Sequence, residues 1–316
     1  MDTFIQQAIN GLTLGSIYAL MALGYTMVYG ILRIINFAHG DLLMVGALSA
    51  LSVVTFLQRH FPGLPVYVLL LLAVLLSMAV CALVAMAIER LAYRRLRHAP
   101  RLAPLISGIG VSLLLQTLAM IIWSRNPLMF PQLLPMDPIP LTRGDGTHAP
   151  AVITVTGIAT LVIACLVMAG LLLLVEHSRL GRAMRATAEN PQVAGLMGIN
   201  PDRIITLTFA IGGTFAALAG VMMASNYGNA GFSMGFLPGI KAFTAAVLGG
   251  IGNIRGAMLG GLLLGLIESL GAGYLGELTK GNFGSNYQDI FAFIVLIAVL
   301  IFRPSGLLGE RVANRA

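Results

Sequence analysis

Residues 66–89, VYVLLLLAVLLSMAVCALVAMAIE, decide the fold, because their single charged residue, Glu89, stands at the very end. A helix needs roughly 20 consecutive apolar residues to cross the hydrocarbon core of a bilayer. A membrane β-strand would instead alternate apolar and polar residues over about ten positions. The stretch therefore predicts a transmembrane α-helix.

Comparable apolar runs lie on both sides of this stretch. They cover residues 8–30, 36–57, 102–124, 152–175, 204–225, 239–252, 256–275 and 287–302. The run 239–252 is too short to span the membrane as a straight helix. It either spans in another form or is a half-helix or re-entrant segment, whose ends must be covered by protein or water. We expect one all-α domain over residues 1–316, a polytopic membrane protein with eight or nine transmembrane helices.

The composition excludes a soluble globular protein. The chain is 58% hydrophobic and 10% charged, whereas soluble domains carry about 25% charged residues. The net charge of +7 does not indicate nucleic-acid binding, because the basic residues cluster in short segments between apolar runs. We expect a multi-pass protein of the bacterial inner membrane, in contact with lipid.

The arginine distribution predicts an orientation. Arginines concentrate in residues 90–101, 178–203 and 303–315, and such segments are usually cytoplasmic. Counting back three crossings places the N-terminus outside, while the C-terminus lies inside. The proline-rich segment 125–150 is then a periplasmic loop, ordered or extended, because proline cannot continue a helix. A cysteine at residue 145 should therefore be labelled from the periplasm.

No signature of an enzyme or of a bound cofactor stands out. The chain has no phosphate-binding Gly-x-x-x-x-Gly-Lys-[Ser/Thr] loop, no His-Glu-x-x-His helix and no Gly-x-Ser-x-Gly elbow. Cys81 and Cys165 both lie in apolar runs, away from other metal ligands, and are interpreted as small buried hydrophobic residues. We expect no metal, no cofactor and no catalytic residue in this chain.

Polar residues inside the apolar runs are candidates for a translocation pathway. A charge in hydrocarbon costs about 2.5–3.5 kcal/mol on insertion scales, so such residues rarely face lipid. The candidates are Asn36, His39, Asp41, Lys241, Thr244, Asn253 and Glu268. The alternative is a structural hydrogen-bond network at a helix break. Glu268 needs an internal partner, for which Lys241 and Arg255 are both available.

Two further patterns concern packing. The breaks at Asn36–Asp41 and Gly249–Arg255 each place polar residues before a glycine-rich run, which suggests that they face one another. Small residues recur four apart at Gly11 and Gly15, and in the pairs 256/260 and 261/265, so helix backbones can approach closely there. Such seams serve either packing within the chain or a subunit interface.

The segment 178–201, SRLGRAMRATAENPQVAGLMGINP, is polar and alanine-rich and lies between two predicted spans. Arg182 and Arg185 lie one turn apart on a predicted helix. Asn190 can cap a second helix that begins at Pro191, and Gly198 can end it in a left-handed conformation. Two short helices would form a compact cytoplasmic knob. The alternative is an interfacial helix held by anionic lipid.

Several motifs together resemble a known family. The pattern Ala-x-Ala-Glu-Asn-x-x-x-Ala-x-x-x-Gly-Ile-Asn covers residues 186–200 and looks like the coupling loop of ATP-binding-cassette permeases. GSIYAL at 15–20, GYTMVYG at 24–30, INFAHGD at 35–41 and KAFTAAVLGGIGN at 241–253 resemble the H-type subunit of the high-affinity branched-chain amino acid permeases. The likeness covers about residues 8 to 309, and it is weakest in 125–150 and 226–235.

The resemblance implies a transport subunit rather than an enzyme. It implies import of Leu, Ile or Val by alternating access, with a second homologous permease, two ATPase subunits that bind the ATP, and a periplasmic binding protein. It also implies that Arg182, Arg185, Glu189, Asn190 and Gly198 couple the chain to an ATPase. Importers of urea, amides or a wider set of neutral amino acids use similar subunits. An ion-coupled secondary transporter would need intramembrane carboxylates, such as Asp41 and Glu268.

Overall fold

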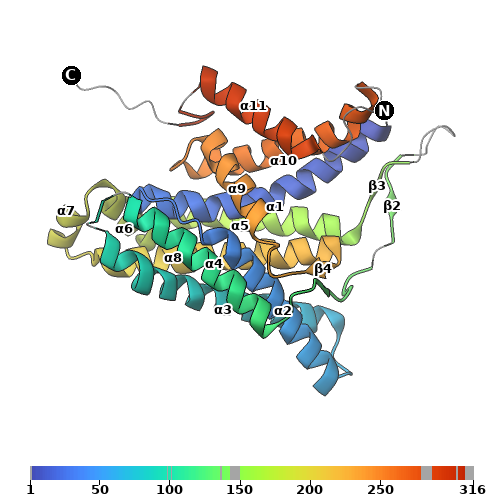
Figure 1. Ribbon diagram of the computed structural model, residues 1–316, viewed down its shortest axis with the longest axis horizontal. Helices are drawn as coiled ribbons and strands as arrows, with labels where there is room; N and C mark the ends of the chain where they lie inside the picture. The colour runs from blue at the N-terminus through green and yellow to red at the C-terminus, as the bar shows by residue number, and fades with distance from the viewer. Residues whose placement is uncertain are drawn as a thin grey trace.

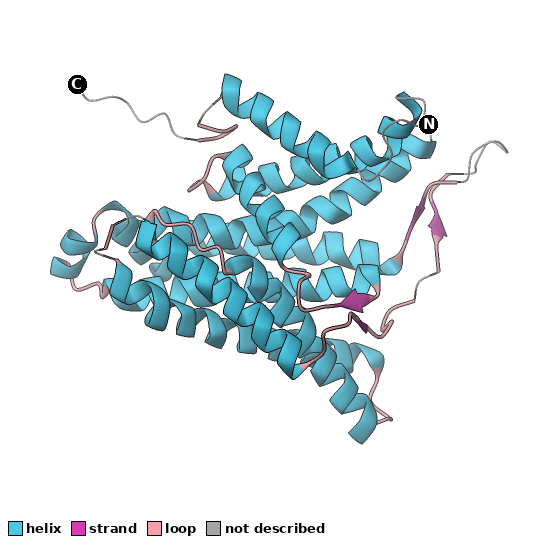
Figure 2. Cartoon of the chain, viewed as in Figure 1, coloured by secondary structure: helices cyan, strands magenta, loops and turns pink. Residues whose placement is uncertain are grey.

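The computed structural model describes residues 2–97, 99–100, 102–135, 137–142, 150–278, 287–303 and 305–309. The described chain is an elongated bundle of helices with two short antiparallel ribbons (Figures 1 and 2). The helices are α1 Asp2–Leu32, α2 His39–His60, α3 Val66–Ile88, α4 Leu102–Ile122, α5 Val155–His177, α6 Arg179–Glu189, α7 Pro191–Leu196, α8 Pro201–Tyr227, α9 Phe236–Gly249, α10 Ile254–Leu278 and α11 Gln288–Phe302. A π-helical turn, Glu89–Tyr93, and a 3-10 turn, Arg94–Leu96, extend α3.

Seven of the described helices are long and apolar enough to cross a membrane: α1, α2, α3 with its extension, α4, α5, α8 and α10. Two shorter apolar helices accompany them, α9 and the part of α11 from Phe293 to Phe302. The prediction of a polytopic all-α membrane protein is confirmed. With 14 residues, α9 is about 21 Å long, which is less than the hydrocarbon core of about 30 Å. It ends where Gly250 adopts a φ of 105°.

Helix α1 is the centre of the bundle and packs against α8, α9 and α10. Its seam with α10 is built from glycines: a Cβ on Gly11 would lie 2.8 Å from the Cα of Leu266, and one on Gly15 would lie 2.8 Å from the carbonyl oxygen of Leu262. On the other side, Gly261 lies against Ala19. These small residues therefore let two helices of the same chain touch along their backbones, as the packing alternative predicts.

Helices α3, α4 and α5 form the apolar outside of the bundle. Leu83, Ile106, Ile121 and Leu166 are all more than 60% exposed. In a soluble protein this much exposed leucine and isoleucine would be an aggregation hazard, whereas in a bilayer it meets lipid or another apolar helix.

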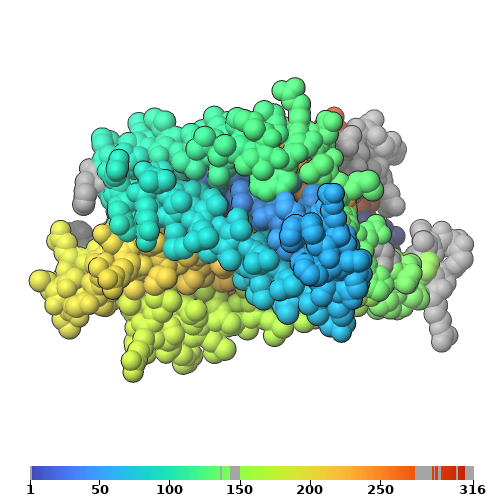
Figure 3. Space-filling model, turned by 90° about the horizontal axis from the view of Figure 1, so that it is seen from below, coloured from blue at the N-terminus to red at the C-terminus, as the bar shows by residue number. Residues whose placement is uncertain are grey.

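The arginine-rich segments gather at one end of the bundle. Arg97, just after α3, forms an ion pair of 2.5 Å with Asp202 at the start of α8. Arg255, at the start of α10, pairs at 2.5 Å with Glu176 at the end of α5. Helices α6 and α7 lie at this end, where they project beyond the bundle (Figures 1 and 3). This placement fits the predicted orientation, in which all these segments are cytoplasmic.

The opposite end carries the start of α1 and the ribbons (Figure 1). Strand β1, Leu128–Met129, pairs with β4, Asn229–Ala230, and β2, Ile139–Pro140, pairs with β3, Val152–Ile153. The described part of 125–150 is thus extended chain, as its prolines suggest. Residue 145 lies outside the described residues.

Candidate functional site

A cluster of charges is buried where α1, α9, α10 and α11 meet, and we call it the ion cluster. Lys241 Nζ on the short helix α9 lies 2.7 Å from Glu268 Oε1 and 2.7 Å from Asp289 Oδ1. The hydroxyl of Tyr18 donates to Glu268 at 3.1 Å, and Lys241 lies 5.7 Å from the centre of the Tyr18 ring. The carboxylate is 3% exposed, so these partners replace the water that it has lost.

The predicted need for an internal partner of Glu268 is therefore met by Lys241. Arg255, the other candidate, is paired with Glu176 at the arginine-rich end. Thr244, one turn after Lys241, is 8% exposed, and its hydroxyl donates to the Lys241 carbonyl at 2.6 Å. Two of the predicted pathway residues, Lys241 and Glu268, are thus brought together, with Thr244 beside them.

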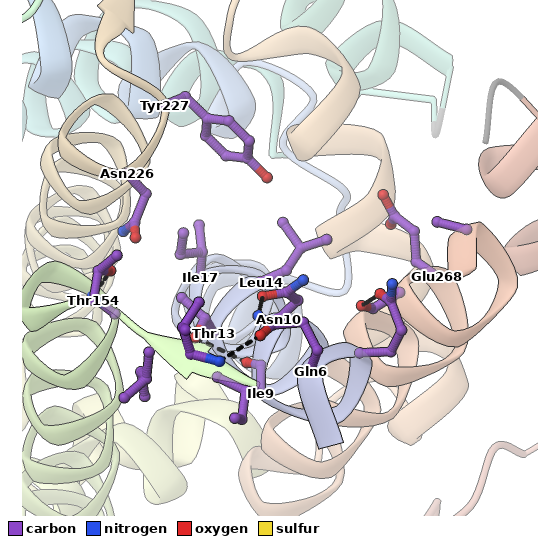
Figure 4. Close-up of a pocket in the computed structure, with 16 residues that line it drawn as sticks. Gln6, Ile9, Asn10, Thr13, Leu14, Ile17, Thr154, Asn226, Tyr227 and Glu268 are labelled. Atoms are coloured by element: carbon purple, nitrogen blue, oxygen red, sulfur yellow. Dashed lines mark hydrogen bonds between the residues drawn. The ribbon is translucent and has the colours of Figure 1, made fainter. Parts of the chain in front are cut away.

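A cavity of ≈ 480 Å³ adjoins the ion cluster at the end of the bundle where α1 begins, and we call it the N-terminal cavity. Glu268 lies in its wall, together with side chains from α1, from α8 and from residues 152–154 just before α5 (Figure 4). The polar lining residues are Gln6, Gln7, Asn10, Thr13, Thr154, Asn226, Tyr227, Glu268 and Ser269. Small-molecule pockets in proteins measure about 300–1,000 Å³, so this cavity has the size of a ligand site.

Hydrogen bonds fix several of these side chains. Gln6 Oε1 accepts from the backbone N–H of Val152 at 2.7 Å, and Gln6 Nε2 donates to Asn10 Oδ1 at 2.9 Å. Gln7 Oε1 accepts from Ser269 Oγ at 2.8 Å. The wall of the cavity is therefore a hydrogen-bonded network rather than a set of mobile surface groups.

Sequence reasoning missed the part of this site that comes from α1. Gln6, Asn10, Thr13 and Ile17 repeat at the three- and four-residue spacing of one helix face. That spacing was the available signal, because a polar stripe on a membrane helix faces protein or water rather than lipid.

The break before α2 forms a separate polar group. Asn36 Oδ1 accepts from the Ala38 N–H at 3.1 Å and from the Tyr93 hydroxyl at 3.0 Å. Asp41 accepts from Gln116 Nε2 at 3.0 Å. His39 is 2% exposed and meets the edge of Tyr25, with 4.7 Å between ring centroids. Asn36, His39 and Asp41 line no part of the N-terminal cavity, and their bonds have the form of the predicted structural network.

The glycines of the two breaks make their closest contacts with other segments. Gly40 at the start of α2 lies against Gly235 and Gly239 at the start of α9, whereas Gly249 lies against Gly256. Asn253 caps α10, with its Oδ1 accepting from the Gly256 N–H at 3.1 Å, and it donates to the Leu308 carbonyl at 2.8 Å. Gly40 of the first break thus lets α2 approach the start of the short helix α9 closely.

The knob, residues 178–201, forms the two short helices that were expected. Asn190 Oδ1 accepts from the N–H groups of Gln192 and Val193 at 3.0 and 3.1 Å and so caps α7, with Pro191 in the first turn. Gly198 has a φ of 82°, which only glycine adopts without strain. The N–H of Ile199 then donates to the Ala194 carbonyl at 3.0 Å and closes the turn.

The tip of the knob is apolar and open. Leu196 is 88% exposed, Met197 79% and Val193 52%. Glu189 is also exposed. Arg182 donates to the His177 carbonyl at 3.3 Å, while Arg185 donates to the Val175 carbonyl and, at 3.4 Å, to that of Glu176. The two arginines thus hold α6 to the end of α5, where cations suit the unpaired carbonyls.

A second buried carboxylate, missed from the sequence, lies beside the knob. Glu89 is fully buried and accepts from the Thr206 hydroxyl at 2.7 Å, from Arg94 Nε at 3.3 Å and from Arg97. Arg97 also pairs with Asp202. We call these residues the Glu89 network; it joins the end of α3 to the start of α8, the helix that follows the knob.

These features define a class of protein: a multi-pass helical membrane protein with an ion-paired interior, a polar cavity at one end and a helical knob at the other. Among the described residues, no group of three or more His, Cys, Asp or Glu is placed to hold a metal ion. The chain belongs to the family described as branched-chain amino acid transport system / permease component, whose model matches residues 7–300.

The similar curated proteins agree with this membership. The high-affinity branched-chain amino acid transport system permease protein BraD of Pseudomonas aeruginosa is 48% identical over 308 residues, covering 97% of this chain and 96% of the relative. The corresponding permease LivH of Escherichia coli K12 is 42% identical over the same shares. The autoinducer 2 import permease LsrC of Photorhabdus laumondii is 32% identical, over 39% of this chain and 36% of the relative. No solved structure matches the chain.

Proposed function

We propose that this chain is the membrane-spanning permease subunit of an ATP-driven importer that carries leucine, isoleucine and valine by alternating access. The observation that supports this most strongly is its 48% identity, over 97% of its length, to a high-affinity branched-chain amino acid permease. The match extends over nearly the whole chain rather than over one segment of it. Urea, amides and a wider set of neutral amino acids are the alternative substrates.

The proposed assembly is the one that membership of the permease family implies. The sequence contains no nucleotide-binding loop, and two separate ATPase subunits bind the ATP in this proposal. A second homologous permease completes the membrane part, and a periplasmic binding protein delivers the amino acid. The setting is the bacterial inner membrane, with the arginine-rich end in the cytoplasm.

The knob is the proposed contact with an ATPase. Val193, Leu196 and Met197 offer an exposed apolar tip, which suits a protein socket better than water. Glu189 contributes its negative charge to this contact, and Gly198 contributes the shape of the turn that follows α7. Arg182 and Arg185 act indirectly, since they hold α6 against α5, and Asn190 acts by capping α7.

An ion-coupled secondary transporter is the rival class. Such a protein needs a carboxylate that takes up and releases an ion. Glu268 is already paired with Lys241 at 2.7 Å, and Asp41 is bonded to Gln116 at 3.0 Å. Both carboxylates therefore have internal partners, which favours a structural or lining role over ion coupling.

Uptake by the assembled importer tests the proposal. Proteoliposomes should contain this chain, the second permease, the ATPases and the binding protein, with labelled leucine outside. We expect accumulation that requires ATP and binding protein and that persists when a protonophore collapses the proton gradient. Accumulation that a protonophore stops, with ATP having no effect, would instead establish the rival class. Competition by isoleucine, valine, alanine, urea and acetamide defines the substrate range.

Topology can be tested separately, in intact cells that express the chain. Met129 is 89% exposed in β1 and lies in the loop predicted to be periplasmic. A cysteine placed there should react with a membrane-impermeant reagent in intact cells, and one at Leu196 should react after permeabilisation. The reverse pattern would overturn the orientation.

A further inference from the structure

The charge balance of the ion cluster points to a cationic ligand beside it. Lys241 is paired with two carboxylates, Glu268 and Asp289, so the three groups together carry a formal charge of −1. Glu268 also lines the N-terminal cavity. A carboxylate accepts about four hydrogen bonds, and among the described residues its donors are Lys241 and Tyr18. With respect to these residues, the carboxylate that lines the cavity retains acceptor capacity.

The amides of the cavity supply the opposite chemistry. The oxygen atoms of Gln6, Gln7 and Asn10 already accept hydrogen bonds from Val152, Ser269 and Gln6 respectively. These bonds fix the orientation of each amide. The amide nitrogens of Gln7 and Asn10 have no acceptor within the described part of the chain, so they can donate to a ligand. Two amide nitrogens suit a carboxylate, which only accepts.

An apolar surface completes the wall. Ile9, Leu14 and Ile17 line the same cavity, and Figure 4 shows them on α1, the helix that also carries Gln6 and Asn10. We propose that the N-terminal cavity binds the free amino acid as a zwitterion, with its ammonium group at Glu268 and its carboxylate at Asn10 and Gln7. The aliphatic side chain then packs on α1. This inference rests on the proposed function and assigns the first site on the path after delivery.

Protection from chemical labelling tests the site without relying on transport. A Thr13→Cys variant, made in a Cys165→Ala background, places a thiol in the cavity wall. Thr55→Cys is the matched control, since both threonines donate to the carbonyl four residues earlier on a helix and Thr55 lines a different cavity. The rate of reaction with an impermeant thiol reagent is measured in nanodiscs containing the permease complex without binding protein.

We expect millimolar leucine to slow labelling at position 13 and to leave position 55 unchanged. Two analogues of leucine each lack one charge: 4-methylpentanoate has no ammonium group, and isopentylamine has no carboxylate. Each should protect roughly tenfold less well than leucine, because one charged hydrogen bond is lost. Equal protection by 4-methylpentanoate would overturn the assignment of Glu268.

Two further variants separate recognition from structure. Glu268→Gln and Asp289→Asn each remove one carboxylate partner of Lys241, yet only Glu268 lines the cavity. Protection by leucine should be lost in Glu268→Gln, which removes both the negative charge and its oxygen in the cavity wall, and only weakened in Asp289→Asn, which removes the net charge but leaves Glu268 in place. Equal loss in both variants would make the role of Glu268 structural. Unprotected labelling at position 13 with normal ATP-driven uptake refutes the site and leaves the proposed function standing. Absence of uptake in the unmodified importer refutes the proposed function itself.

Discussion

The N-terminal cavity and the knob lie at opposite ends of the same bundle, and they are built in opposite ways. The cavity and its ion cluster draw on residues as far apart as Gln7 and Ser269, which are joined by a hydrogen bond. The knob is made within 24 consecutive residues, by the caps at Ser178 and Asn190 and by the turn at Gly198. The cavity and its ion cluster should therefore be lost when the helices separate, whereas the knob should be lost when one of its local turns is disrupted.

The comparison predicts that the largest loss of stability follows substitution of Lys241 in the ion cluster. Lys241→Met should leave the buried Glu268 without a counter-charge, at a cost of about 3–5 kcal/mol, and it also removes the partner of the half-buried Asp289. Thermal unfolding of the purified protein in detergent should show a large fall in the midpoint, with little folded protein recovered. Arg255→Met is the matched control, because the Arg255–Glu176 pair is 66% and 40% exposed and such a pair contributes about 0–1 kcal/mol. Equal losses in both variants would remove the distinction between the two pairs.

A smaller effect is expected at Glu89, where a long-range ion network meets the knob. Glu89→Gln keeps the shape of the side chain but weakens its bonds to Arg94, Arg97 and Thr206, at a cost of about 1–3 kcal/mol. Because the Glu89 network fixes the start of α8, ATP hydrolysis by the complex should continue while leucine uptake per ATP falls. Unchanged uptake per ATP would show that the network only supports the fold.

At Gly198 the expected cost is local. Gly198→Asp places a residue with a Cβ atom at a φ of 82°, which costs about 1–2 kcal/mol. The substitution should also change the angle at which the chain leaves α7. We expect normal insertion into the membrane together with failed ATPase assembly or hydrolysis that loaded binding protein no longer stimulates.

Glu189→Lys should have the same effects because it reverses a charge at the proposed contact, whereas a knob resting on anionic lipid would tolerate the added cation. Normal leucine import by both variants would exclude the knob as the coupling element.

The smallest effect should come from the cap of α7. Asn190→Ala removes the acceptor for two N–H groups and should destabilise that helix by about 1 kcal/mol. Hydrogen exchange should speed up in residues 191–196 and stay unchanged in α9 and α10. Asn190→Ser is the conservative control, because serine caps nearly as well. Faster exchange throughout the bundle would mean that the knob is not a local unit.

The predictions made from the sequence succeeded where a feature depends on neighbouring residues. Seven of the expected spans are long apolar helices, and the short run near 239–252 is a helix of half length. The caps at Asn190 and Gly198 follow from residue type and spacing alone. Glu89 was missed because it ends an apolar run, where a charge is ordinary. Its three partners, Arg94, Arg97 and Thr206, lie 5, 8 and 117 residues away, and no local pattern reveals the contact with Thr206.

The sequence by itself determined the class of fold, the apolar helices, the arginine-rich segments and the knob, because hydrophobic length, cap residues and charge act over a few residues. Only the tertiary structure decided that Lys241 rather than Arg255 pairs with Glu268 and that Gly40 meets α9 rather than the second break. It also decided that amides of α1 share a cavity with Glu268. The physical reason is that a buried charge takes whichever partner the packing of helices brings within about 3 Å, and that packing depends on complementary surfaces along whole helices.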